Sequence, residues 1–227
     1  NPGIRTPHID RLAAEGVRFD ESYVANPVCM PNRASLFTGR FPKAHGLREN
    51  GLTLALSERI LPEILRKSGY QTMASGKIHL APFDMRPDIA DHPHECYEGH
   101  AYWAGHDTMP TPYYGFEQVY FVGGHGSYCF GQYKNELERE HTGAWDAMQK
   151  ANALVPPTGA RESWKSAIPE EHHYNTRIAD RTMAFITDRD ESRPFFLWCS
   201  FPDPHHPYSP PRPYCDMYDP EALAFNP

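Results

Sequence analysis

The sequence has no long run of apolar residues, few cysteines and no excess of positive charge, and each shortage excludes a class of protein. No stretch approaches the roughly 20 apolar residues that a membrane-spanning helix needs. The formal net charge of -7 gives no support for nucleic-acid binding. The 5 cysteines are irregularly spaced and do not suggest a disulfide framework. No signal peptide is visible, and the sequence assigns no compartment.

Proline and glycine are frequent, by contrast, and they divide the chain into short segments. The 227 residues include 23 prolines and 16 glycines, and this length is sufficient for one domain with a sizeable core. The chain begins at Asn1 rather than at Met and ends at Pro227. We therefore expect it to be part of a longer polypeptide.

Helices and strands are predicted to alternate at both ends of the chain. Pro7 in a first turn and Gly16 after a last turn predict a short amphipathic helix, and 17–23 resembles a strand. A strand is expected over 70–75, and the apolar run 194–201 predicts a strand buried on both faces. This alternation indicates an α/β fold with a mostly parallel sheet flanked by helices.

Two further helices are predicted from apolar spacing, one over 62–68 and closed by Gly69, the other over 174–188. The side chains expected to face the core from the three helices are Ile9, Leu12, Ala13, Leu61, Ile64, Leu65, Ile178, Met183 and Ile186.

One segment, Cys29-Met30-Pro31-Asn32-Arg33, carries more chemical information than the rest of the chain. Pro31 in a first turn and Gly39 just past a last turn predict a helix with Cys29 at its N-terminus. Exposed backbone N–H groups and the helix dipole favour an anion at that end. The alternative interpretation of Cys29 is a buried structural thiol.

Three further residues are candidate partners of Cys29 because each follows a predicted strand. Lys77 and His79 are two residues apart, so an extended chain would present both on one face. The ligand crevice of an open α/β sheet lies outside the carboxyl ends of its strands, so His205 can join them. His206 is the alternative to His205, and we favour His205 because it stands in a His-x-Pro register.

The motif and its surroundings resemble the sulfatases, whose signature is Cys-x-Pro-x-Arg. Both flanks of Cys29 look like sulfatase sequence, and the Lys77 and His205 segments are similar to two further family motifs. The resemblance is dense over 1–80 and over 175–212. The matching segments, in family order, are 4–19, 29–46, 76–80 and 204–207.

The resemblance implies an alkaline-phosphatase-like fold, of which 1–227 would be a partial, N-terminal stretch of the catalytic domain. It implies that a formylglycine-generating enzyme oxidises Cys29 to formylglycine, and that this residue then ligates Ca²⁺ or Mg²⁺. The family's two other pairs of metal ligands would lie before Asn1 and beyond Pro227, since neither pair is found here. The implied site residues are Cys29, Arg33, Lys77, His79 and His205.

The family roles imply the reaction. Arg33 would hold the modified side chain, Lys77 and His205 would bind sulfate, and His79 would contact the gem-diol or the sulfate. The expected function is hydrolysis of a sulfate ester, of a small molecule or a sulfated sugar, to an alcohol and sulfate. One alternative is a phosphonate monoester or phosphodiester hydrolase of the same superfamily. Another is a catalytically inactive binding domain that keeps the Cys29 thiol.

The central region, 84–170, is rich in glycine, proline and aromatic residues without sustained periodicity, and we interpret it as an irregular insertion for substrate recognition. Within it, 91–96 contains candidate zinc ligands but lacks the paired spacing of a zinc site, so a solvated loop is favoured. The glycine-rich segment around His125 has no following Lys-Ser/Thr and is assigned no ligand.

Overall fold

The computed structural model describes residues 3–84, 93–96, 102–155 and 159–222. In this part of the chain, three strands form one parallel sheet with the order β2-β1-β3. The strands are β1 (Gln71–Gly76), β2 (Gln118–Phe121) and β3 (Phe195–Ser200). The α-helices are α1 (Pro7–Glu15), α2 (Cys29–Thr38), α3 (Pro42–His45), α4 (Leu61–Lys67), α5 (Tyr102–Gly105), α6 (Gln132–Glu140) and α7 (Tyr174–Asp188), and short 3₁₀ turns lie between them.

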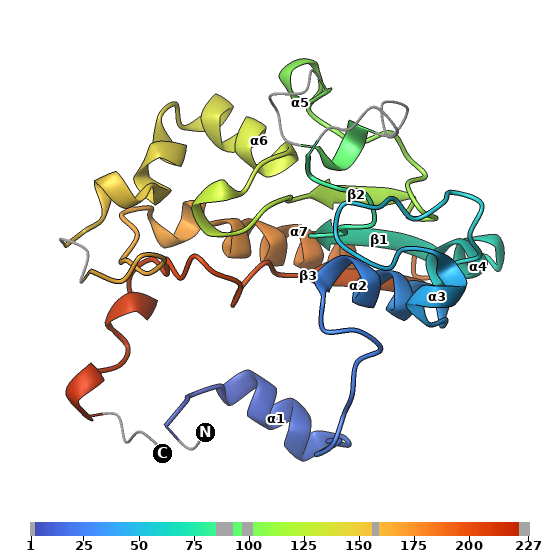
Figure 1. The fold of residues 1–227 in the computed structure, drawn as a ribbon, viewed down its shortest axis with the longest axis horizontal. Coiled ribbons are helices and arrows are strands. Elements are labelled where there is room, and N and C mark those ends of the chain that lie inside the picture. The colour runs from blue at the N-terminus through green and yellow to red at the C-terminus, as the bar shows by residue number, and fades with distance from the viewer. Residues whose placement is uncertain (1–2, 85–92, 97–101, 156–158, 223–227) are drawn as a thin grey trace.

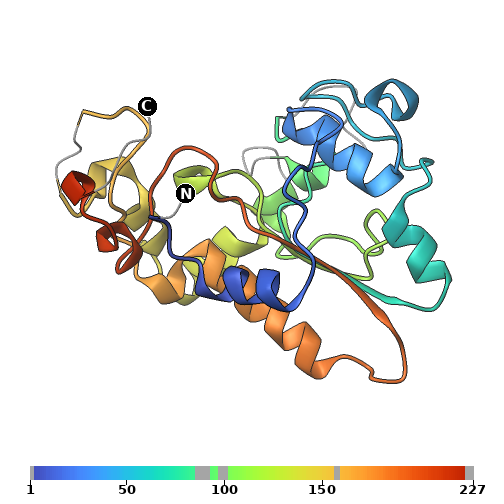
Figure 2. The ribbon, with the colours of Figure 1, turned by 90° about the horizontal axis from the view of Figure 1, so that it is seen from below.

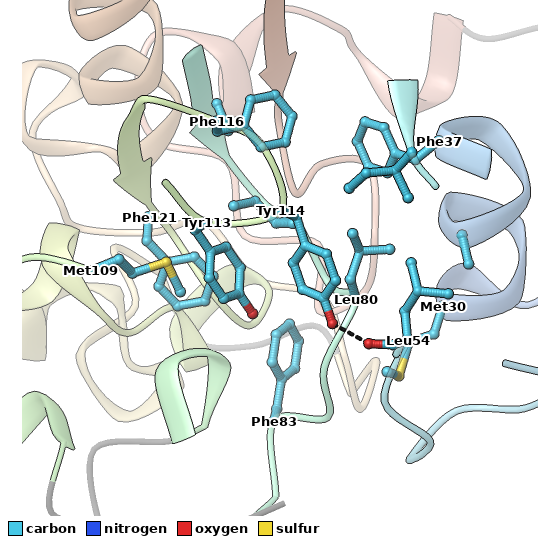
Figure 3. Packing of buried hydrophobic residues seen from close by; sticks show 14 of the residues in the cluster. Met30, Phe37, Leu54, Leu80, Phe83, Met109, Tyr113, Tyr114, Phe116 and Phe121 are labelled. Carbon is cyan, nitrogen blue, oxygen red and sulfur yellow. Dashed lines mark hydrogen bonds between the residues drawn. The ribbon is translucent and has the colours of Figure 1, made fainter. Parts of the chain in front are cut away.

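Each face of the sheet is covered by its own hydrophobic core, because side chains alternate between the faces along a strand. On one face, Ala74 and Phe121 belong to a cluster that includes Met30 and Phe37 of α2 (Figure 3). On the other face, Met73 belongs to a cluster that α6 and α7 complete. The sheet therefore lies between helical layers, with α7 behind it in Figure 1. The predicted parallel α/β fold is confirmed.

The local signals for α2, α4 and α7 predicted these helices correctly. Gly39 ends α2 in the left-handed conformation, with φ 66, and donates its N–H to the Ser35 carbonyl. The bounds predicted for α7 agree with the structure. The prediction of which α7 side chains face the core is wrong in part. Ile178 is buried, together with Tyr174 and Phe185, whereas Met183 and Ile186 are exposed.

Other predictions of burial also fail because they depended on neighbours that sequence patterns do not reveal. Helix α1 forms as expected, yet none of its residues is buried, and Figures 1 and 2 show it joined to α2 by an extended segment. Leu61 and Ile64 are exposed on α4. Residues 17–23 form no strand. The predicted burial of β3 on both faces is wrong, because Ser200 is its only buried residue and the others are half-buried or exposed.

The central region is more regular than its sequence predicts. It supplies β2, which pairs with β1, and α6, which packs against β2. Its aromatic residues Trp103, Phe116 and Tyr133 are buried in the two cores. Much of 84–170 is therefore part of the domain itself. None of the helices in the described residues combines the length and apolar character needed to cross a lipid bilayer.

Candidate active site

Cys29 is the first residue of α2, as the motif predicted, and its neighbours at this helix end come from a distant loop. The N–H of Met30 donates to Oδ1 of Asn50 at 3.2 Å, and Nδ2 of Asn50 lies 3.4 Å from the Cys29 sulfur. Asn50 thus satisfies one of the free N–H groups of the first helical turn and contacts the thiol. Cys29 is half-buried and has no disulfide partner in the described structure.

Arg33 connects α2 to the carboxyl ends of two strands. Its Nη1 donates to the carbonyl oxygen of Lys77 at 2.9 Å and to the Ser200 hydroxyl at 3.0 Å. Burial lowers the pKa of this guanidinium, while the nearby Cys29 and Glu95 raise it. An arginine remains protonated under these conditions, so Arg33 supplies a fixed positive charge between Cys29 and the strand ends.

The chain leaves β1 through Gly76, which has a φ of 102. A Cβ at this position would lie 2.0 Å from the Ser200 carbonyl oxygen, so only glycine allows β1 and β3 to approach so closely. The next N–H, that of Lys77, donates to the same oxygen at 3.0 Å. This close approach brings the Lys77 segment against the end of β3.

The Lys77 ammonium is buried and contacts His125, with 2.6 Å between Nζ and Nε2. Burial, followed by the charge of Arg33, lowers the pKa of Lys77 to about 8. Burial and the charge of Lys77 lower the pKa of His125 to about 3, so this imidazole is neutral at pH 7. Neutral Nε2 then accepts a hydrogen bond from the ammonium.

His79 lies on a turn rather than on the extended chain that the sequence predicted. Its φ of 61 is in the left-handed region, which is uncommon for a residue with a Cβ. The ring stacks on Phe83 with 3.9 Å between centroids. Burial and the charges of Lys77 and Arg33 lower its pKa well below 6.5, and its buried Nδ1 has no partner among the described residues.

His205 reaches this cluster from the end of β3. Its ring stacks on His125 with 3.6 Å between centroids, and its Nδ1 lies 2.7 Å from the carbonyl oxygen of His206. His205 is half-buried, whereas His206 is exposed. Burial lowers the pKa of His205. Arg33, Lys77, His79 and His205 thus lie in one cluster, and Arg33 connects this cluster to Cys29 through the first turn of α2. His205, rather than His206, is the histidine that stacks on His125.

A cavity of about 400 Å³ opens beside the cysteine. Its lining includes Cys29, Arg33, Trp198, Ser200, Phe201 and Asp203. Lys77 and His79 are almost fully buried, and Arg33 links their segment to this cavity through the Lys77 carbonyl.

The described residues contain no group of three or more His, Cys, Asp or Glu side chains that could hold a metal ion. Asp203, which lines the cavity, is engaged by the Tyr174 hydroxyl at 3.0 Å and by the Asn175 amide. Asp91 and His92 of the candidate zinc segment lie outside the described residues. A hard divalent cation needs six or more oxygen ligands, so the residues that the structure describes do not form such a site by themselves.

Three residues of the site were missed by sequence reasoning. Asn50 and His125 stand in no ligand motif, and only the fold brings them to Cys29 and Lys77. Glu95 was interpreted as part of a solvated loop, but Glu95 and Cys96 are both fully buried. That interpretation is wrong for these two residues, because Glu95 accepts hydrogen bonds from Leu80 and Ala81 and the Cys96 thiol lies 3.5 Å from the Pro82 carbonyl oxygen.

The sulfatase family model matches residues 1–223, and the chain belongs to the sulfatase family. The chain is 31% identical over 232 residues to an ulvan-active sulfatase of Formosa agariphila, covering 100% of this chain and 36% of that protein. It is 42% identical over 77 residues to an N-acetylglucosamine-6-O-sulfatase of Bacteroides thetaiotaomicron, covering 34% of this chain and 14% of that protein. The chain thus spans well under half the length of these relatives.

Among solved structures, the fold is similar to that of a phosphonate monoester hydrolase of Agrobacterium radiobacter, with a TM-score of 0.70 and 25% identity. The similarity covers 98% of this chain and 41% of that one. The fold of this chain is therefore that of the sulfatases and phosphonate hydrolases in the alkaline phosphatase superfamily.

Proposed function

We propose that the protein hydrolyses a sulfate ester to an alcohol and sulfate, with Cys29 as the precursor of the nucleophile. The observation that carries this proposal is the geometry around Arg33. Cys29 begins α2, and Arg33, one turn later, hydrogen-bonds the segment of Lys77 at the end of β1 and Ser200 at the end of β3. One helix thereby links the motif cysteine to both strand ends that carry the candidate anion-binding side chains.

The electrostatics of the cluster support an anionic ligand. Arg33 and Lys77 lower the pKa of His79, and Arg33 lowers that of Lys77, so positive charge is crowded in a buried space. An anion bound here would offset this repulsion, and its interaction would be strong because water is largely excluded. The unpartnered Nδ1 of His79 is a further polar atom that a ligand could satisfy.

Lys77 and His205 differ in their access to water, and we assign them different roles for this reason. Lys77, with 2% of its surface exposed, is suited to hold a charged oxygen in a fixed position. His205 is half-buried and can exchange a proton with solvent, so we assign it the protonation of the leaving oxygen. His125 accepts the Lys77 hydrogen bond and stacks on His205, and therefore orients both groups.

Cys29 is a suitable position for formylglycine, because the thiol is half-buried at a helix N-terminus and contacts the Asn50 amide. Formylglycine at this position would supply, as its hydrate, one hydroxyl to attack sulfur while the S–O bond to the alcohol breaks and the alcohol takes a proton. Loss of a proton from the second hydroxyl would then break the C–O bond to sulfate and restore the aldehyde. The family relationship also implies Ca²⁺ or Mg²⁺, with the modified Cys29 as one ligand. The described residues do not complete that site, and we assign no step to the ion.

We propose a sugar sulfate as the substrate class, since the N-acetylglucosamine-6-O-sulfatase shares 42% identity over the matched 77 residues. Residues of 84–170 that lie near the strand ends are candidates for recognition of the sugar. The similarity to the phosphonate monoester hydrolase favours a second candidate, hydrolysis of phosphonate monoesters, which differ from sulfate esters in the central atom.

Two measurements test the proposal in the full-length protein. The mass of the peptide that contains Cys29 reports whether the thiol has become an aldehyde, and an unmodified thiol in active protein would refute the role of Cys29. Comparison of kcat/KM for an aryl sulfate and for a phenyl phosphonate monoester distinguishes the two reactions. Absence of both reactions from protein that keeps the Cys29 thiol would favour a catalytically inactive binding domain.

A further inference from the structure

Glu95 is a fully buried carboxylate that the proposed reaction does not use. It ends a 3₁₀ turn (Pro93–Glu95) and accepts hydrogen bonds from the N–H groups of His79, Leu80 and Ala81. The Tyr113 hydroxyl donates to Oε1 at 2.9 Å. The turn that carries His79 is therefore built around one side chain from a separate part of the sequence.

The four donors favour the ionised form of this carboxylate. An ionised carboxylate only accepts hydrogen bonds, whereas a protonated one must also donate, and all the groups named here are donors. Burial opposes ionisation and raises the pKa of Glu95 to about 7, while the donors from Leu80, Tyr113 and His79 lower it. The three backbone donors also compensate the left-handed conformation of His79, which is unfavourable for a residue with a Cβ.

Glu95 also acts on the cations of the site. Its charge raises the pKa of both Lys77 and Arg33. A nearby negative charge keeps a buried cation protonated, and the protonated form is the one that can bind an anion. The titratable groups that interact with the Lys77 ammonium are Cys29, Arg33, His79, Glu95, His125, Cys129 and His205.

We propose that Glu95 is a positioning residue of the active site. Its carboxylate holds residues 79–81 in the turn that orients His79 and provides the buried negative charge that balances Lys77 and Arg33. The inference rests on the proposed function, because it assigns Glu95 to the support of anion binding by these groups. Glu95 itself is fully buried and does not line the cavity beside Cys29.

The first test compares Glu95→Gln with Glu136→Gln in the full-length protein. Glu136 is a matched control because it is also buried and pairs with Arg181, on the face of the sheet covered by α6 and α7. Glu95→Gln should lower kcat/KM by tenfold or more. It should also move the loss of activity at alkaline pH (the alkaline limb, where Lys77 loses its proton) to lower pH, because removal of a neighbouring negative charge lowers the pKa of an ammonium.

The outcome that overturns the proposal is a pH profile unchanged in Glu95→Gln, or a loss of activity no greater than in Glu136→Gln. If Glu95→Gln does not fold, Glu95→Asp and Tyr113→Phe decide the question. Glu95→Asp keeps the charge but shortens its reach, so kcat should fall while the alkaline limb stays. Tyr113→Phe removes one donor and should lower kcat without loss of the fold, and two variants with wild-type kcat would refute the proposal.

A measurement without turnover separates this inference from the proposed function. Protein made with ¹³C-labelled lysine allows the Lys77 pKa to be followed by NMR in wild type and in Glu95→Gln, with the Lys77 signal assigned from its absence in Lys77→Arg. A lower Lys77 pKa in the variant supports the role of Glu95 even if no sulfate ester is hydrolysed. An equal Lys77 pKa refutes the role even if the protein is an active sulfatase.

Discussion

Two neighbouring parallel strands of this molecule end in different surroundings. After β1, residues 77–83 are all buried, and Glu95 supports their turn from below. After β3, only Pro202 and Pro207 of residues 201–208 are buried, and His205 is half-buried. The first segment has ionisable groups with strongly shifted pKa values, because desolvation and neighbouring charges act without much screening by water.

The difference indicates a division of roles. A buried cation gives strong binding of a charged oxygen but exchanges protons with solvent poorly, whereas a half-buried imidazole is suited to proton transfer. Residues of the segment after β1 should therefore govern anion binding, and those after β3 should govern the protonation step. Mutagenesis can break or sharpen this comparison.

The largest effect is expected at Cys29, on which both segments converge. Cys29→Ser removes the thiol that a cysteine-specific oxidase converts, so turnover of a sulfate ester should fall to background. The measurement is kcat with an aryl sulfate, together with the peptide mass. Wild-type turnover by Cys29→Ser would contradict the whole assignment, including the comparison of the two segments.

The second-largest effect is expected in the buried segment after β1. Lys77→Ala should lower kcat/KM by about a hundredfold to a thousandfold, the scale for loss of one electrostatic contact in a dry site. Inhibition by free sulfate should weaken in parallel, because the same ammonium would bind the product. If Lys77→Ala loses kcat but binds sulfate as tightly as the wild type, Lys77 has a role other than sulfate binding.

A smaller effect is expected in the segment after β3, where two adjacent histidine variants can be compared. His205→Ala should lower kcat by about a hundredfold, at the lower end of the range for general acid catalysis. His206→Ala is the matched control, and it should change kcat about twofold or less, since surface substitutions usually alter free energies by under about 0.5 kcal/mol. Equal losses of kcat in His205→Ala and His206→Ala would show that the choice of His205 as the histidine that faces the site is wrong.

The smallest effect is the pH dependence of the wild-type protein. Burial lowers the pKa of Lys77 from 10.5 to about 8, so the ammonium is present below pH 8 and is lost as the pH rises through that value. We therefore expect kcat/KM to be about tenfold lower at pH 9 than at pH 7. Lys77→Arg should remove this alkaline limb, since arginine stays protonated, and persistence of the limb would assign it to another group.

Helices and strands with strong local signals were predictable. Pro31 and Gly39 mark the two ends of α2, and the apolar spacing of 174–188 agrees with α7. The parallel sheet followed from the alternation of helices and buried strands. The individual helices and the strands β1 and β3 depend on neighbours within a few residues, so a single sequence contains the information that specifies them.

The candidate site was predictable only as a set of motif residues. Cys29, Arg33, Lys77, His79 and His205 were identified from short motifs and from the rule that strand ends converge. The reason given for Lys77 and His79 was wrong, because the chain turns after Gly76 instead of continuing as a strand. Their proximity results from the hydrogen bonds of that turn rather than from strand alternation.

The sequence by itself determined the helix that begins at Cys29, the strands β1 and β3, and the family motifs, because these depend on the spacing of nearby residues. Only the tertiary structure decided that Asn50 contacts the thiol, that His125 contacts Lys77, and that Glu95 is buried beneath the turn. These contacts join residues 14 to 48 positions apart. Their energies come from burial and from charges that meet only when the chain has folded, so no local pattern records them.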